Sequence, residues 1–229
     1  FALALGLRVA HVLAYRASPL FEEPQMDALY HVEWARALAA GREYQDGPYF
    51  RAPLYPWLLG AVFAACGDGL LLPRLLQAGL GALGVLCTYC IARRAFDRTT
   101  GALAGLFAAT HWTAIFYDGE LLLEALATPL YLAALLATLR LAQSGSTRSA
   151  LVAGLLFGLS AICRPNVLIY LPALGLYLLL AGRTRWRPLC AFGLATLIPI
   201  APVSAINLAE GDRVLISYQG GVNFWIGNN

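Results

Sequence analysis

Long apolar stretches with almost no charge recur along the whole sequence, and they constrain the fold more than any other feature. The clearest lie at 75–92, 99–117, 165–182 and 188–209. Shorter ones lie at 1–15, 121–139 and 149–163. An α-helix needs about 20 predominantly apolar residues to cross a bilayer, so this repetition predicts an all-α, polytopic membrane protein.

The composition supports this prediction. Hydrophobic residues make up 59% of the chain and charged residues 13%, with a mean hydropathy of +0.65, whereas soluble domains carry about 25% charged residues. Such a chain cannot cover a water-facing surface, which excludes a soluble enzyme, a disordered chain and a nucleic-acid-binding protein. Its five cysteines lie in apolar runs and are interpreted as core residues. Because residue 1 is Phe, we expect a piece of a longer protein.

The positive charges, all of them arginine, orient the chain in the membrane. Eight fall in three connections: Arg93, Arg94 and Arg98; Arg140 and Arg148; and Arg183, Arg185 and Arg187. Those connections contain one acid, Asp97, while the other 12 of the 13 acids lie elsewhere. Cytoplasmic loops are enriched in arginine, so we expect these three connections inside and the acidic segments outside.

The apolar run 52–65 decides how the spans are counted. It has 14 residues and two prolines near its start, which is more typical of an interfacial or re-entrant helix than of a span. We therefore expect seven spans with the N-terminus inside. The long first outer loop, 16–70, then carries juxtamembrane helices, and 208–229 forms another outer loop.

A candidate site lies in the first outer loop. The stretch 27–40 is bounded by a proline and a glycine and predicts a helix. Asp27, Tyr30, His31 and Trp34 recur at helical spacing and share one face. Two interpretations stay open: an amphipathic surface helix capped by Asp27, or an acid placed over a cavity.

A second acidic group, Asp118, Glu120 and Glu124, follows the third apolar stretch. Glu120 and Glu124 are four residues apart, which predicts a shared helix face. Glu124 also enters an apolar segment, where an ionisable residue is a functional candidate. The alternative is that Glu124 pairs with an arginine of a neighbouring helix.

Arg51 and Arg164 are outer-side cations near the membrane interface. A guanidinium group can bind a phosphate through two hydrogen bonds, whereas the alternative is that each snorkels to lipid headgroups. Together with the carboxylates of two loops, they predict a site for a phosphate-bearing lipid and for a nucleophile that awaits deprotonation. The pattern alone does not identify the reaction.

Six motifs occur in order along nearly the whole chain. They are P-x-x-D-A-L-Y at 24–30, Y-F-R-A-P-L-Y-P at 49–56, P-R-L-L-Q-A-G-L-G-A at 73–82 followed by Ala92-Arg93-Arg94, Y-D-G-E-L-L-L-E at 117–124, G-L-S-A-I-C-R-P at 158–165, and G-G-V-N-F-W-I-G-N-N at 220–229. With this ordered set the chain resembles the N-terminal membrane region of a GT-C glycosyltransferase. Within that class it resembles the bacterial relatives of dolichyl-phosphate-mannose protein mannosyltransferases and lipid A aminoarabinose transferases.

The resemblance implies a GT-C-like catalytic module over 1–229 in the bacterial plasma (inner) membrane. Its activity would be inverting transfer of a sugar from a polyprenyl phosphate to a protein, lipid or glycan acceptor on the extracytoplasmic side. Asp27 would be the catalytic base, and either Glu120 or Glu124 the second acid near the acceptor.

The same resemblance implies that Arg51, with Arg164, binds the donor phosphate. We expect Tyr30, His31 and Tyr55 to complete the substrate-binding site. The family often has Lys-Pro-Pro or Glu-Lys-Pro where this chain has Phe50-Arg51-Ala52. A glutamate that could bind a metal is therefore missing, and a divalent metal stays an open alternative.

Two other functions are compatible with an acidic outer face. A transporter or flippase of a lipid-linked sugar should show broken helices or inverted repeats. The runs A-G-L-F at 104–107 and A-G-L-L at 153–156 instead predict close helix packing through small residues. A non-catalytic membrane scaffold would use its acids only as helix caps.

Overall fold

The computed structural model describes residues 1–180 and 186–228, where all regular elements are helical. The chain divides into two compact units. The first comprises Phe1–Tyr44 and Tyr55–Leu136, and the second comprises Gln45–Leu54 and Ala137–Asn229. The expected all-α fold is thus confirmed for the described residues.

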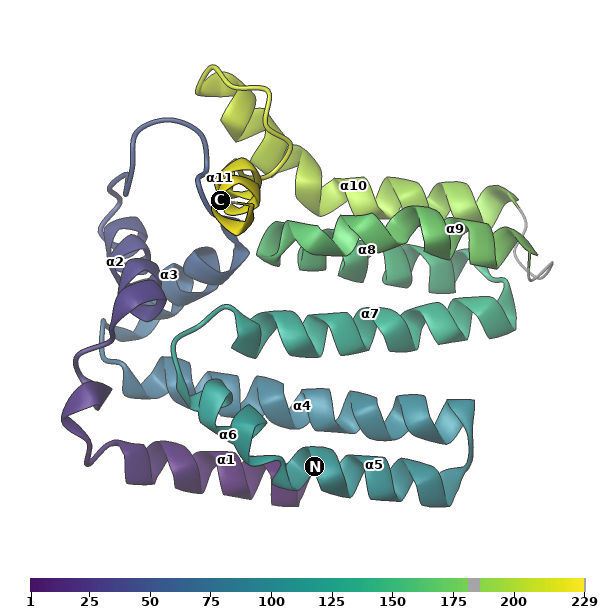
Figure 1. Cartoon of the computed structure of the whole chain (residues 1–229), viewed down its shortest axis with the longest axis horizontal. Coiled ribbons are helices and arrows are strands. Elements are labelled where there is room, and N and C mark those ends of the chain that lie inside the picture. The colour runs from purple at the N-terminus through teal and green to yellow at the C-terminus, as the bar shows by residue number, and fades with distance from the viewer. Residues whose placement is uncertain (181–185, 229) are drawn as a thin grey trace. The chain divides into compact units, whose positions relative to one another are not determined.

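The first unit is built around one long helix, α4 (Leu71–Ala95), which packs against α1, α5 and α6 (Figure 1). Its other elements are α1 (Ala2–Tyr15), η1 (Pro19–Phe21), α2 (Met26–Ala39), α3 (Leu54–Cys66), α5 (Arg98–Thr110), α6 (Trp112–Gly119) and the start of α7 (Glu124–Ser144). Small side chains let these helices approach closely: buried Ala4, Ala82 and Ala109 pack together with Val85.

The second unit contains α8 (Thr147–Cys163), η2 (Pro165–Tyr170), α9 (Leu171–Leu180), α10 (Trp186–Ala209) and α11 (Gln219–Gly227). Helices α8 and α10 lie side by side (Figure 1). A Cβ atom at Gly154 would overlap the carbonyl oxygen of Phe192, and one at Gly158 would overlap that of Thr196. The predicted close packing through small residues is therefore confirmed for the run at 153–156.

Three helices of the described chain, α4, α7 and α10, are long and apolar enough to cross a membrane. Helices α1, α3 and α8 and the segment Pro165–Leu180 are apolar but shorter. The structure thus confirms a chain with membrane helices, while the count of seven spans stays a prediction. Part of the arginine-rich connection at 183–187 falls on residues 181–185, outside the described chain.

The stretch 99–117, expected as one span, is divided into two helices. Helix α5 ends at Thr110, His111 has an extended backbone, and α6 begins at Trp112. The His111 Nδ1 atom accepts a hydrogen bond from the Ala114 N–H at 3.2 Å and so caps α6. At the other end of α5, Asp97 accepts the Thr100 N–H at 2.8 Å, and this hydrogen bond lowers the pKa of the Asp97 carboxyl.

Candidate functional site

Helix α2 carries Asp27 almost where the sequence predicted it. The helix runs from Met26 to Ala39, and Gly41 follows in the left-handed region with φ 64°, a common way for a helix to end. The prediction that Asp27 caps the helix is wrong, because Gln25 occupies the N-cap position and Asp27 lies in the first turn. Its carboxylate is exposed there, at the helix end that favours negative charge.

The residue before Asp27 has an unusual backbone. Met26 has φ 51° and a side chain that is 87% exposed. A long side chain at positive φ is sterically disfavoured, and such strain is concentrated at functional sites. Met26 therefore turns the chain abruptly into the helix at the position that presents Asp27.

Aromatic rings from α2 and α3 pack behind this turn. The ring of His31 contacts that of Tyr55 edge-on at 5.1 Å, and Tyr30 contacts His31 and Trp34 at 5.8 Å each. The predicted shared face of α2 is confirmed for these three residues. His31 and Tyr55 are each 1% exposed, so they join α2 to α3, while half-buried Tyr30 retains accessible surface.

A chain of hydrogen bonds leads from Tyr55 to the second acidic group. The Tyr55 hydroxyl donates to Gln77 Oε1 at 2.7 Å. Gln77 Nε2 in turn donates to the backbone oxygen of Asp118 at 3.1 Å and to that of Glu120. Gln77 is 2% exposed, so this contact links α3, α4 and the connection after α6 inside the first unit.

Glu120 and Glu124 do not share a helix face, contrary to the prediction. Helix α6 ends at Gly119, α7 begins at Glu124, and residues 120–123 between them are not helical. The Glu120 carboxylate lies beside the Tyr15 hydroxyl and close to His11. The two acids therefore have different surroundings.

Arg74 is a buried cation of this region that the sequence analysis missed. It is 1% exposed, and its guanidinium carbon lies 4.0 Å from the ring centroid of Phe21 and 5.3 Å from that of Tyr15. Its Nε donates a hydrogen bond to the Gly119 carbonyl at 3.0 Å. The Glu120 carboxylate also interacts electrostatically with the guanidinium group. Cation–π and carbonyl contacts replace the water that the guanidinium lacks. The sequence feature that could have identified Arg74 is its position as a charged residue beside a long apolar stretch.

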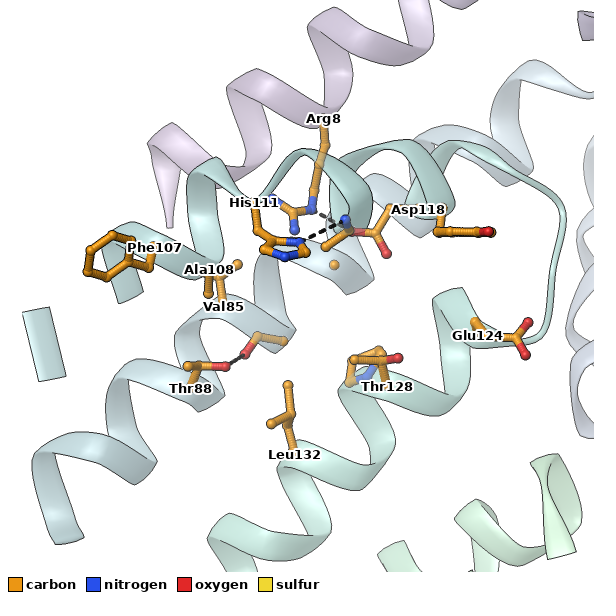
Figure 2. A pocket seen from close by; sticks show the side chains of 15 residues that line it. Arg8, Val85, Thr88, Phe107, Ala108, His111, Asp118, Glu124, Thr128 and Leu132 are labelled. Carbon is orange, nitrogen blue, oxygen red and sulfur yellow. Dashed lines mark hydrogen bonds and ion pairs between the residues drawn. The ribbon is translucent and has the colours of Figure 1, made fainter. Parts of the chain in front are cut away.

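Arg8 and Asp118 form a buried ion pair within a cavity of about 340 Å³ (Figure 2). The Arg8 Nε donates to Asp118 Oδ2 at 2.6 Å, and Arg8 is 2% exposed. Glu124, from α7, lines the same cavity with His111. Of the second acidic group, Asp118 thus pairs with an arginine of another helix, whereas the sequence analysis considered such a pairing for Glu124.

The two arginines expected to bind phosphate both lie in the second unit. Arg164 is exposed and follows α8 directly, where Pro165 disfavours a helical conformation for the preceding residue. Arg51 is half-buried in the segment 45–54. Both arginines are therefore held outside the bodies of the long helices.

Asn207, another residue that the sequence analysis missed, anchors the segment before Arg51. It is fully buried, and its Oδ1 accepts the Tyr49 N–H at 2.9 Å. Its Nδ2 donates to the carbonyls of Val214 at 3.1 Å and Ile216 at 3.0 Å. Further backbone bonds tie the same segment to residues 218–219. The buried Asn207 amide thus connects two loops. The sequence feature that could have identified it is an asparagine within a long apolar run.

Among the described residues, no cluster of three His, Cys, Asp or Glu side chains is arranged to hold a metal ion. Carboxylates and guanidinium groups are the candidates for contact with a substrate that the site described above contains.

Apolar helices long enough to cross a membrane, together with a buried ion pair and carboxylates near helix ends, are typical of a membrane protein with a polar site. The family model of dolichyl-phosphate-mannose-protein mannosyltransferases matches residues 50–206. The chain belongs to this family, so it is a membrane glycosyltransferase of the GT-C type, and its family implies a lipid-linked sugar donor. Comparison with curated proteins and with solved structures gives no match.

Proposed function

We propose that the protein is an inverting glycosyltransferase that moves a sugar from a polyprenyl phosphate to an acceptor hydroxyl at the outer face of the bacterial plasma membrane. The family match is the observation that carries this proposal, and it includes Arg51, Glu120, Glu124 and Arg164. Asp27 precedes the matched residues. Its assignment rests on the motif at 24–30 and on its exposed position at the start of α2.

In the proposed reaction, the acceptor oxygen attacks the anomeric carbon while the Asp27 carboxylate takes its proton. The bond between the anomeric carbon and the phosphate oxygen breaks, and its electron pair leaves with the polyprenyl phosphate. One direct displacement inverts the configuration at the anomeric carbon. No covalent intermediate with the protein is needed, because the phosphate is already a good leaving group.

Arg51 and Arg164 supply positive charge for the departing phosphate. Negative charge grows on that group as the bond breaks, and guanidinium donors stabilise it in the transition state. Either Glu120 or Glu124 acts as the second carboxylate, on the acceptor side. Tyr30, His31 and Tyr55 complete the substrate-binding site: half-buried Tyr30 contacts the substrate, while buried His31 and Tyr55 fix the orientation of α2 and thereby the position of Asp27.

The proposal is tested by the substitution Asp27→Asn in the purified protein. Removing a general base lowers the rate by about 10²- to 10⁴-fold, while the neutral amide keeps the size of the side chain. The measurement is loss of labelled sugar from a polyprenyl-phosphate donor. Asp46→Asn, at an exposed acid of the same loop, is the matched control and should transfer sugar at the wild-type rate. A fully active Asp27→Asn protein would refute the assignment.

The role of Arg51 is tested separately by Arg51→Ala. Loss of a charged hydrogen bond to phosphate should weaken binding of polyprenyl phosphate by roughly tenfold to a hundredfold. Equilibrium binding of labelled polyprenyl phosphate measures this. Arg42→Ala, at an exposed arginine nearby, should bind like the wild type. If Arg51→Ala binds polyprenyl phosphate as tightly as the wild type, Arg51 does not bind the donor and only anchors the chain at the membrane interface.

A further inference from the structure

We propose that Arg8, Arg74 and Gln77 form a clamp that presents Glu120, rather than Glu124, as the second carboxylate of the site. The inference rests on the proposed function and assigns a positioning role to three buried residues of α1 and α4. None of the three would touch the substrate. Each acts through the short segment 118–120.

The first arm of the clamp is Arg8. This charge sits in the middle of apolar α1, and its guanidinium contacts three elements: Asp118 at 2.6 Å, the Ala4 carbonyl at 3.2 Å and the Ala109 carbonyl at 3.4 Å. Burying a guanidinium and a carboxylate is expensive, and such pairs are best retained where they specify one arrangement. Here the Arg8–Asp118 pair specifies how α6 packs against α1.

The second and third arms hold the backbone. Carbonyl groups at the end of a helix have no partner within the helix, and α6 ends at Gly119. Arg74 Nε donates to the Gly119 carbonyl at 3.0 Å, while Gln77 Nε2 donates to the Asp118 carbonyl at 3.1 Å and to that of Glu120. Three consecutive carbonyl groups are thus fixed by two buried side chains of α4.

The clamp determines where the Glu120 carboxylate lies. With its backbone held, Glu120 leaves the end of α6 beside the Tyr15 hydroxyl and His11, with the Arg74 charge nearby. Glu120 itself is half-buried. Glu124 is placed differently: its backbone belongs to the first turn of α7, and it lines the cavity shown in Figure 2. The buried polar contacts of α4 therefore act on Glu120, while α7 positions Glu124.

Gly81 of α4 makes the ion pair possible. A Cβ atom at this position would overlap the Asp118 carboxylate and would lie 2.6 Å from Arg8 Nε. Two residues earlier on the same helix, a Cβ atom at Gly79 would meet nothing within 4 Å. The pair Gly81→Ala and Gly79→Ala is thus a matched test, because both changes add one methyl group to α4 and only one disturbs the clamp.

We expect Gly81→Ala to slow sugar transfer from a labelled polyprenyl-phosphate donor by about a hundredfold, the effect of misplacing a catalytic group by about 1 Å. Its equilibrium affinity for polyprenyl phosphate should equal that of the wild type. Gly79→Ala should match the wild type in both measurements. Transfer at the wild-type rate by a folded Gly81→Ala protein would overturn the clamp.

A double variant separates positioning from stability. Replacing both members of a buried ion pair by apolar residues commonly preserves stability, so Arg8→Met/Asp118→Leu should keep its melting temperature and donor affinity but lose transfer. Full transfer by this stable double variant would overturn the proposal, as would a larger loss of transfer in Glu124→Gln than in Glu120→Gln. If the wild type releases no sugar from any polyprenyl-phosphate donor, the proposed function fails instead.

Discussion

Glu120 and Glu124 have the same kind of side chain, but their backbones place them in different surroundings. The sequence places them four residues apart, and this spacing predicted a common helix face. The structure interrupts the helix over 120–123, so one acid joins Tyr15 and Arg74 while the other lines a cavity. Spacing alone could not reveal this, because the side chains that bond to the segment, Arg74 and Gln77, lie far from it in the sequence.

Arg8 and Arg74 show what the sequence could have revealed. An ionisable residue inside an apolar helix is costly and therefore informative. That rule was applied to Glu124 but applies equally to these two arginines. Both are at most 2% exposed and bind the segment that carries the acids. Their partners, however, are mainly backbone carbonyls and a distant aspartate, which no local pattern identifies.

At the residue scale, Asn207 provides a test of how Arg51 is held. Asn207→Ala removes three hydrogen bonds to backbone groups, one of them buried and two part-buried, and a buried group left unsatisfied costs about 1–3 kcal/mol. We expect a lower melting temperature and weaker binding of polyprenyl phosphate. The control is Asn223→Ala, at an exposed asparagine of α11, which should change neither. A wild-type melting temperature and donor affinity in Asn207→Ala would contradict the anchoring role.

At the scale of the elements, the helix ends could be predicted from the sequence where a proline or a glycine follows the helix. Helix α2 ends just before Gly41, and α8 ends two residues before Pro165. Apolar runs likewise located α4, α7 and α10. The break at His111 was not predicted, because an unbroken apolar run over 99–117 contains no proline there. A histidine that caps the following helix ends α5 instead.

The contact between α8 and α10 gives a prediction for a whole element. A methyl group at Gly158 would overlap the Thr196 carbonyl, so Gly158→Ala must push the two helices apart. Overpacking of this kind costs about 1–3 kcal/mol, and the melting temperature in detergent should fall. Gly175→Ala in α9 is the control, since a Cβ atom there would meet nothing within 4 Å. Equal melting temperatures for the two variants would show that this close approach is unimportant.

At the scale of the whole molecule, the family and the class of fold could be predicted from the sequence. The ordered motifs indicated a GT-C glycosyltransferase, and the family match over 50–206 confirms this. Seven spans, the inside position of the N-terminus and the roles of the site residues stay predictions. They depend on the side of the membrane that each loop occupies, which apolar length alone does not determine.

The central claim is that Asp27 and Glu120 act together on the extracytoplasmic face. The most direct measurement is thiol labelling of intact cells with a membrane-impermeant maleimide, in a protein whose five cysteines have been replaced. Met26→Cys, beside Asp27, and Glu120→Cys should both react from outside, whereas Phe96→Cys, in an arginine-rich connection, should react only after permeabilisation. Reaction of Met26→Cys and Glu120→Cys from opposite sides of the membrane would contradict the account.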